Sequence, residues 1–203
     1  MTDRTAAPAR RRLTKRQRRA QLLDAARDLI RDSGTDEFTL ARLAERAGVT
    51  KPLVYDHFGD RSGVLAELYR AFEERRRETL ARVLDATPPE LGAVADVVAA
   101  AYVDCCLAEG RELADVVAAL AGSPALSAVR REAEEAYLRM CREALEPLAG
   151  PIDAAALPAI VGAGDALARS ALADDMTAED AAATLARVVE AVVTGTRPTT
   201  EEG

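Results

Sequence analysis

The stretch that decides the fold reads TLARLAERAGVTKPLVYDHF and covers residues 39–58. Its apolar residues recur at helical spacing in two short runs. Gly48 stands between the runs, where a tight turn needs a positive φ. Thr39 and Thr50 stand directly before the runs as candidate caps, and Pro52 lies in the first turn of the second run, where its missing N–H costs little. We therefore expect two short helices joined by a three-residue turn, which is a helix-turn-helix.

The second of these helices is expected to have one buried and one outward face. The spacing turns Val49, Val54 and Phe58 toward the core, and the small Ala44 lies where the two helices cross. The side chains left on the outer face are those of Lys51, Leu53, Tyr55, Asp56 and His57. A helix presented in this way fits the major groove of DNA.

Helical periodicity and capping residues extend the prediction along the rest of the chain. Capping boxes are expected at Thr14, Thr87 and Thr177, and Gly34 is a good stop for the first helix. Besides the helices 39–47 and 51–57, the pattern predicts helices over 14–33, 61–85, 90–109, 112–121, 124–148, 153–174 and 177–193. Neither a strand nor an internal repeat is predicted. The fold class is therefore all-α, with about nine helices.

Charge is divided unevenly along the chain. The formal net charge is -7, yet residues 1–61 hold 14 Lys or Arg against 9 Asp or Glu, and the remainder holds 13 against 25. Within the first 19 residues there are 8 basic side chains and a single acidic one, Asp3. A basic N-terminal region followed by an acidic remainder suits a polyanionic partner that contacts only the N-terminal region. A solvated basic tail on an ordinary acidic protein explains the charge equally well.

Several classes of protein are disfavoured by the composition. No apolar stretch approaches the roughly 20 residues of a membrane span, the basic N-terminus has no apolar segment behind it, and three cysteines suit a reducing compartment, so we expect a cytoplasmic protein with no membrane contact. There is no glycine-rich phosphate loop, nucleophile elbow or cluster of metal ligands. We therefore expect neither an enzyme nor a bound cofactor or metal.

The helix-turn-helix and its flank resemble the DNA-binding signature of the TetR family. The shared pattern is Thr39-Leu-Ala-x-Leu-Ala-x-x-Ala-Gly-Val-Thr-Lys-Pro-Leu-Val-Tyr-x-His-Phe-x-Asp-Arg-x-x-Val-Leu65, and the specific likeness covers residues 22–72. The resemblance implies a bacterial repressor that binds a palindromic operator as a homodimer and is released by a small-molecule effector of unknown identity. It also implies four parts: a disordered basic arm (1–13), a DNA-binding domain (14–65), a ligand-sensing and dimerisation domain (66–195) and a polar tail (196–203).

The resemblance also assigns DNA contacts residue by residue. The start of the recognition helix would contact phosphates and base edges, Tyr55 and Arg61 would each reach a phosphate, and the arm would enter a minor groove or follow phosphates. Arg61 stands where a lysine is commoner in the family, and its forked donors should preserve the contact. The predicted DNA-binding residues are Arg10, Arg11, Arg12, Thr39, Thr50, Lys51, Pro52, Leu53, Tyr55, His57 and Arg61.

The acidic half carries two weaker sets of candidates. Residues spaced four apart on two helices suggest a ligand pocket lined by Tyr102, Cys105, Cys106, Tyr137, Met140 and Cys141, although the same residues suit an ordinary core. Apolar and small residues on the last two long helices suggest a dimer interface at Ile160, Gly164, Leu167, Ala171, Leu185, Val188, Val189 and Val192, with intramolecular packing as the alternative.

Three alternatives to the effector-released repressor stay open. They are a DNA-binding protein without an effector, an activator of the same fold, and a repressor that senses oxidants through its thiols. The last requires an accessible cysteine with a low pKa.

Overall fold

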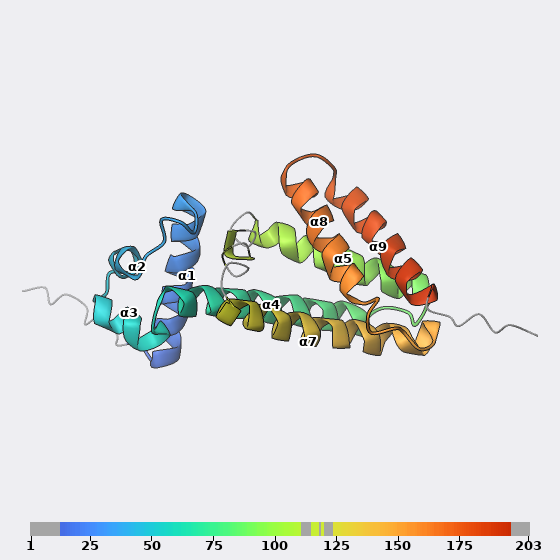
Figure 1. The fold of residues 1–203 in the computed structure, drawn as a ribbon, viewed down its shortest axis with the longest axis horizontal. Coiled ribbons are helices and arrows are strands. Elements are labelled where there is room, and N and C mark those ends of the chain that lie inside the picture. Colours follow the sequence, from blue (N-terminus) through green and yellow to red (C-terminus); the bar gives the residue numbers. More distant parts are fainter. Residues whose placement is uncertain (1–12, 111–114, 118, 120–123, 196–203) are drawn as a thin grey trace, which may run out of the picture. The chain divides into compact units, whose positions relative to one another are not determined.

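The computed structural model describes residues 13–110, 115–117, 119 and 124–195, and every regular element in this part of the chain is a helix (Figure 1). Residues 115–117 and 119 are helical, within the short helix predicted over 112–121. The predicted polar tail and all but Leu13 of the predicted arm lie outside the described residues. The all-α prediction is confirmed. The longer helices are α1 (Lys15–Ser33), α2 (Leu40–Ala47), α3 (Lys51–Phe58), α4 (Arg61–Asp85), α5 (Leu91–Glu109), α7 (Pro124–Ala149), α8 (Pro158–Leu172) and α9 (Ala178–Thr194).

The chain divides into two compact units, Met1–Val64 and Leu65–Gly203. The first contains α1, α2 and α3, and the second contains α5, α7, α8 and α9; α4 begins in the first and continues through the second. The core of the first unit is apolar and well filled, because Leu22, Ala26, Leu43 and Val54 are at most a fraction of a per cent exposed. This small core is what positions α3.

Local capping explains most helix ends in the first unit. The hydroxyl of Thr14 accepts from the Gln17 backbone N–H, and the Gln17 side chain accepts from that of Thr14, which is the expected capping box. Thr39 caps α2 by accepting from the backbone N–H of Arg42. Thr50 differs from the prediction: it occupies the N-cap position of α3, but its hydroxyl makes no capping hydrogen bond.

The turn between α3 and α4 depends on a glycine that the sequence did not single out. Asp60 accepts from the backbone N–H of Gly63 at 2.8 Å, which closes the first turn of α4. A Cβ on Gly63 would lie 2.0 Å from the backbone oxygen of Phe58. Only glycine therefore allows α4 to start so close behind α3.

One predicted cap and one predicted helix start in the second unit were wrong. The Thr87 hydroxyl donates to the carbonyl of Val83 at 2.6 Å, so it ends α4 and does not cap α5, whose N-cap is Glu90. The helix predicted from residue 153 begins only at Pro158. Its missing turn is taken up by Asp153, whose carboxylate accepts from the N–H of Ala155 at 2.9 Å and forms a local turn. Thr177 caps α9 as expected.

Helix α5 lies at the centre of the second unit, in contact with α7, α8 and α9. It has 19 residues, and an 18-residue window within it has a mean hydropathy of 1.8, so the prediction that no apolar stretch approaches the length of a membrane span was wrong for this helix. Its residues Ala95, Val98, Ala99 and Tyr102 are completely buried against the neighbouring helices. This burial is typical of the core helix of a globular domain.

Candidate nucleic-acid interface

The outward face of α3 carries the side chains that the sequence predicted for it. Thr50, Lys51 and Pro52 are exposed, Leu53 is half-buried, and Tyr55 is 53% exposed, which is unusual for so large a ring. The opposite face carries Val54 and Phe58, which are buried; Val49, expected in the core, is only half-buried. Helix α3 thus offers a polar and aromatic surface on a fixed apolar support.

The turn before α3 sets its direction. Gly48 has φ +64° and ψ +38°, which is the left-handed conformation expected of it. Its neighbour Val49 donates its backbone N–H to the carbonyl of Ala44 at 2.9 Å, and Ala44 itself is only 3% exposed. The crossing of α2 and α3 therefore depends on a small side chain and a residue that tolerates positive φ.

An arginine from α1 holds the other end of α3. The Arg19 guanidinium donates to the carbonyl of His57 at 2.7 Å and lies over the ring of Phe58, 4.9 Å from its centre. Burial lowers the pKa of His57, and the positive charges of Arg19 and Lys15 lower it further. His57 is therefore disposed to stay neutral, so it offers DNA a dipole and no full charge.

Arg61 is turned toward the protein in this structure. Its guanidinium donates to the carbonyl of Phe38 at 3.2 Å and to that of Thr35 at 2.6 Å, which ties the start of α4 to the segment before α2. Thr39, the other predicted phosphate contact outside α3, is exposed. To reach a phosphate as predicted, Arg61 must use a guanidinium N–H that is not bonded to these two carbonyls, or it must change its rotamer.

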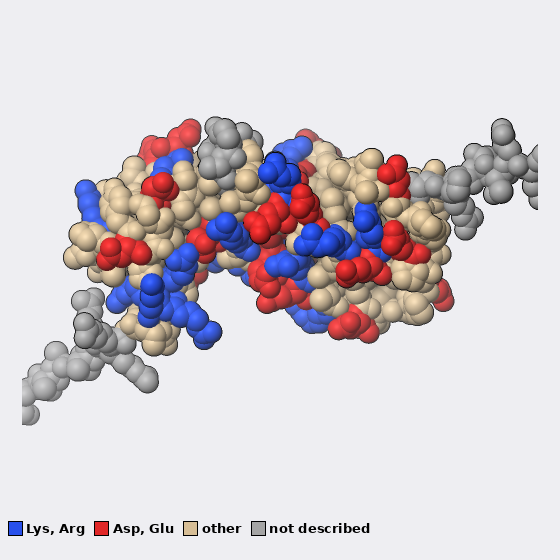
Figure 2. Space-filling model, turned by 60° about the horizontal axis from the view of Figure 1, so that its bottom comes forward, with Lys and Arg blue, Asp and Glu red and all other residues tan. Residues whose placement is uncertain are grey.

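Basic side chains gather on the first unit. Figure 2 shows Lys and Arg side chains grouped at the left, where α1, α2 and α3 are drawn, while the part containing α5 to α9 mixes both signs of charge. Lys15 and Arg16 are exposed on α1, and Lys51 is exposed on α3. Arg42 and Arg46 are paired with nearby carboxylates. The predicted contacts Arg10, Arg11 and Arg12 lie outside the described residues.

The predicted pocket residues of the second unit fall largely in its core. Tyr102 and Tyr137 are fully buried and meet edge to face, with ring centres 5.7 Å apart. Tyr102 and Cys106 line a small, partly open cavity of about 20 Å³, whereas Tyr137, Cys105, Met140 and Cys141 do not line it. The hydroxyl of Tyr102 donates to a carboxylate oxygen of Asp165 at 2.6 Å.

The thiols are poorly suited to redox sensing. Cys106 and Cys141 are buried, and burial raises the pKa of each thiol to about 12. Burial also raises the pKa of Cys105, which is half-buried. A thiol with a raised pKa is largely protonated near neutral pH and reacts slowly with oxidants. Among the described residues, no group of three histidine, cysteine or carboxylate side chains is placed to hold a metal ion.

Sequence reasoning missed the charged residues at the centre of this unit. Glu73 and Arg76 are each 3% exposed and form an ion pair of 2.7 Å. The signal was present in the sequence: Phe72, Arg76 and Leu80 are spaced four apart, so the arginine lies on the apolar stripe of α4.

Four of the eight residues predicted for a dimer interface are buried inside the single protomer. Ile160, Leu185 and Val189 are completely buried in the single chain, and Gly164 packs against the ring of Tyr102. These four residues have little surface left for a second protomer in this conformation, because they are covered within the single chain, and their place in a dimer interface stays an untested prediction. The other four are half-buried and keep some exposed surface: Leu167, Ala171, Val188 and Val192.

Comparison with known proteins gives two kinds of likeness. Residues 22–68 match the family model of bacterial regulatory proteins of the tetR family. The HTH-type transcriptional regulator BetI of Klebsiella pneumoniae is 35% identical over 71 residues, and that of Escherichia coli is 34% identical over 71 residues. Each match spans 35% of this chain and 36% of the relative, so it covers about a third of the length of either protein.

Solved structures resemble the chain over nearly its whole length. The fatty acid degradation regulator FadR from Bacillus halodurans has a TM-score of 0.71 at 21% identity, covering 89% of this chain and 96% of its own. A putative transcriptional regulator from Pseudomonas aeruginosa PAO1 has a TM-score of 0.74 at 19% identity, covering 91% and 94%. At these identities the likeness establishes the fold of the chain.

Proposed function

Because the chain is a member of the TetR family, we propose that it is a DNA-binding transcriptional regulator, and specifically a repressor. It would bind a palindromic operator as a homodimer, with α3 in the major groove, and leave the DNA when a small molecule binds the second unit. The family match over residues 22–68 includes all of α2 and α3, which is the part of the chain that would contact DNA.

The observation that carries this proposal is the outward face of α3. Lys51, Pro52 and Tyr55 are exposed at the start and middle of the helix, while Val54 and Phe58 anchor its other face. Lysine and tyrosine hydroxyl groups are suitable donors for phosphate oxygens, and the first turn of a recognition helix is where base edges are reached. Both ends of α3 are also fixed: Gly48 makes the left-handed turn before it, and Arg19 donates to the carbonyl of His57 near its end. This support holds the exposed face in one orientation.

Selection of bound sequences from random DNA at a fixed salt concentration tests the proposal. We expect enrichment of an inverted repeat whose half-sites lie about one helical turn apart, 10–10.5 base pairs from centre to centre, or a multiple of it. Binding with no enriched sequence would favour an architectural protein, and no binding would refute the proposal.

The Lys51→Ala and Leu53→Ala variants sharpen this experiment. If these side chains reach base edges, each variant should enrich a changed half-site, whereas Asp24→Asn, at an exposed position on α1, should enrich the wild-type sequence. Reporter expression from a promoter that carries the enriched site, with and without the protein, then separates a repressor from an activator.

A further inference from the structure

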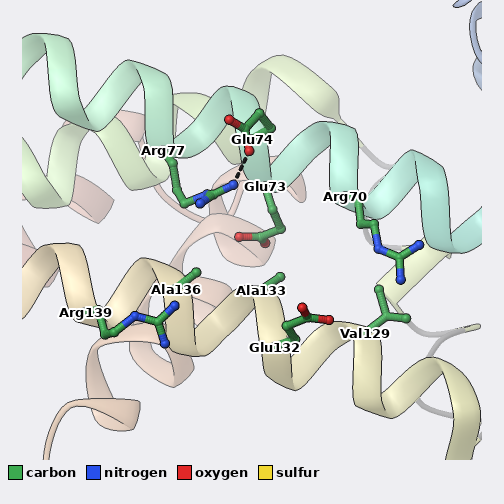
Figure 3. A pocket seen from close by; sticks show the side chains of 9 residues that line it. All are labelled: Arg70, Glu73, Glu74, Arg77, Val129, Glu132, Ala133, Ala136 and Arg139. Carbon is green, nitrogen blue, oxygen red and sulfur yellow. Dashed lines mark hydrogen bonds and ion pairs between the residues drawn. The ribbon is translucent and has the colours of Figure 1, made fainter.

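A groove of about 340 Å³ runs between α4 and α7 in the second unit (Figure 3). Arg70 and Arg77 from α4 and Arg139 from α7 stand on its rim. Ala133 and Ala136 line it on the α7 side, and their short side chains leave the space between the two helices unfilled at this point. The groove is open to solvent, so a small molecule can enter it.

Glu73 lies between this groove and the small cavity lined by Tyr102 and Cys106. Its side chain lines both spaces, and in Figure 3 it extends from α4 toward Ala133 and Ala136. Inside, Glu73 accepts from a terminal nitrogen of Arg76 at 2.7 Å. The cavity of about 20 Å³ holds little more than one water molecule as it stands. Removing the Glu73 carboxylate from its position would join the cavity to the groove.

Arg76 is a buried cation with one donor unused. Its guanidinium lies 4.1 Å from the ring centre of Tyr137, 4.7 Å from that of Tyr102 and 5.5 Å from that of Phe72. Its Nε is buried and has no hydrogen-bond partner. An unmade bond at a buried charged donor costs free energy, and an incoming acceptor would recover it.

The acidic side chains around Arg76 already have hydrogen-bond partners. Asp165 accepts from the hydroxyl of Tyr102 and from Arg130, and Glu134 accepts from Arg130 at 2.6 Å. Glu73 accepts from Arg76. The unsatisfied group that lines the cavity is therefore a donor, and the ligand that completes it is an acceptor.

We propose that the groove and the cavity together form the binding site for a small organic carboxylate, whose carboxylate group replaces that of Glu73 on Arg76. The ligand would accept from Nε and a terminal nitrogen of Arg76 in the two-pronged geometry that guanidinium and carboxylate groups share. Its apolar body would lie between α4 and α7 over Ala133 and Ala136. This inference rests on the proposed function in one respect: the carboxylate would be the effector that releases DNA.

The unsatisfied donor argues for an anion over a cation at this site. The groove itself is balanced in charge, because Arg70, Arg77 and Arg139 share its lining with Glu73, Glu74 and Glu132, and Arg77 is paired with Glu74. An organic cation could pair with these carboxylates, but it could not satisfy the Nε of Arg76, which keeps contacts with three aromatic rings. A carboxylate keeps those contacts and exchanges one anion for another.

Calorimetric titration of the full chain, without DNA, tests the inference. The probes are benzoate, phenylacetate and octanoate, with benzamide as the neutral match of benzoate and benzylamine as the cationic one. We expect at least one carboxylate to bind and neither benzamide nor benzylamine to do so. Glu73→Gln should bind that carboxylate about tenfold more tightly or better. The glutamine keeps the shape of Glu73 but has no negative charge with which to compete with the ligand for Arg76.

Two further variants complete the design. Arg76→Met should abolish binding, and Arg187→Gln, at an exposed position on α9, should bind like the wild type. If Arg76→Met does not fold, the gain expected for Glu73→Gln still decides the question. Absence of binding by all three carboxylates, equal binding of benzamide, binding of benzylamine alone, or weaker binding by Glu73→Gln would each overturn the inference.

The result is separable from that of the proposed function. A protein that selects an inverted repeat but binds no carboxylate would overturn only this inference. A protein that binds a carboxylate but selects no DNA sequence would overturn only the proposed function. Loss of DNA binding on addition of the carboxylate, measured by fluorescence anisotropy of a labelled operator, would support both.

Discussion

Arginine has different roles in the two units of the chain. In the first unit Arg19 and Arg61 stay partly exposed and donate to backbone carbonyls, which ties separate segments together around α3. In the second unit Arg76 is almost wholly buried, stacked on aromatic rings and paired with a single carboxylate. Arg19 and Arg61 are held by backbone carbonyls, which a ligand cannot displace. Arg76 is held by the side-chain carboxylate of Glu73, which another anion can replace.

Under the proposed function, this difference fits a division of work between a unit that reads DNA and a unit that senses a ligand. A surface that reads DNA needs a backbone held in one geometry, because a small misplacement of α3 would misalign all of its contacts. A sensor needs two arrangements that differ by a modest free energy, because a ligand shifts an equilibrium only by its differential affinity for the two. Carbonyl anchors suit the first need, and the Glu73–Arg76 pair suits the second.

The largest combined effect, on stability and on DNA binding together, is expected from Gly63→Ala. The new Cβ would lie 2.0 Å from the backbone oxygen of Phe58, and neither the helix start nor α3 can move without disturbing the other. We expect the free energy of unfolding to fall by about 3 kcal/mol or more, at the upper end of overpacking costs, and sequence-specific DNA binding to be lost. Urea unfolding and operator binding measure the two effects.

Glycines of the second unit provide the comparison for that variant. Gly164→Ala would place a Cβ 2.6 Å from the Tyr102 ring and should cost about 1–3 kcal/mol, because a side chain yields more readily than a backbone. Gly162→Ala meets nothing within 4 Å and should stabilise the protein by about 0.5–1 kcal/mol through helix propensity. A Gly63→Ala variant no less stable than Gly162→Ala would contradict the close approach of α3 and α4.

The next effect is expected from Arg76→Leu. Removing one partner of a buried ion pair costs about 3–5 kcal/mol, because it leaves the other charge uncompensated. Burial raises the pKa of Glu73 above its ordinary value of 4.5, while Arg76 lowers it. A carboxyl group with a raised folded-state pKa contributes most to stability below 4.5 and loses that contribution as the pH rises. Without Arg76 the folded-state pKa rises further, so the deficit of the variant should grow as the pH rises above 4.5.

Urea unfolding of Arg76→Leu and the wild type at pH 5 and pH 8 measures this growth. The double variant Glu73→Gln/Arg76→Leu is the matched control, because it carries no carboxylate at position 73 and should show a deficit that changes little with pH. A deficit of Arg76→Leu that is the same at both pH values would show that Glu73 is not the source of the cost.

Arg61→Ala tests whether the carbonyl anchor also contacts DNA. Loss of its two hydrogen bonds should lower the free energy of unfolding by about 1.5–3 kcal/mol, the usual worth of a hydrogen bond to a charged group. If Arg61 also contacts a phosphate, the slope of log affinity against log salt should become shallower by about 0.9. A loss of stability with an unchanged salt slope would assign Arg61 to the fold alone. Arg46→Ala, whose guanidinium pairs with the Asp32 carboxylate on the surface, is the matched control.

The contrast between the units also explains what the sequence could predict. Helix ends set by adjacent residues, such as Thr14 with Gln17 or Gly48, were predicted correctly because their hydrogen bonds and dihedral angles are local. Thr87 was assigned to the wrong helix because its hydroxyl could bond forward or backward, and the choice depends on the fold. The outward face of α3 was likewise predictable from helical spacing and the small core beneath it.

The second unit was less predictable because its key contacts join distant parts of the chain. Arg76 of α4 meets Tyr102 of α5 and Tyr137 of α7, and no local pattern specifies that meeting. Apolar residues such as Leu185 could equally have filled a dimer interface or the protomer's own core, since both bury the same stripe. Periodicity identifies the face that is buried, but it does not identify the partner that buries it.

The smallest effect is expected from Tyr55→Phe. Phenylalanine keeps the ring, which is 53% exposed, so the free energy of unfolding should not change measurably. If the hydroxyl donates to a phosphate, its loss should weaken operator binding by about two- to tenfold, the worth of one ordinary hydrogen bond. The selected sequence should stay the same, because phosphate contacts position a protein without reading bases. Anisotropy titrations and a repeated selection measure both, and a changed half-site would instead place Tyr55 among the residues that read the sequence.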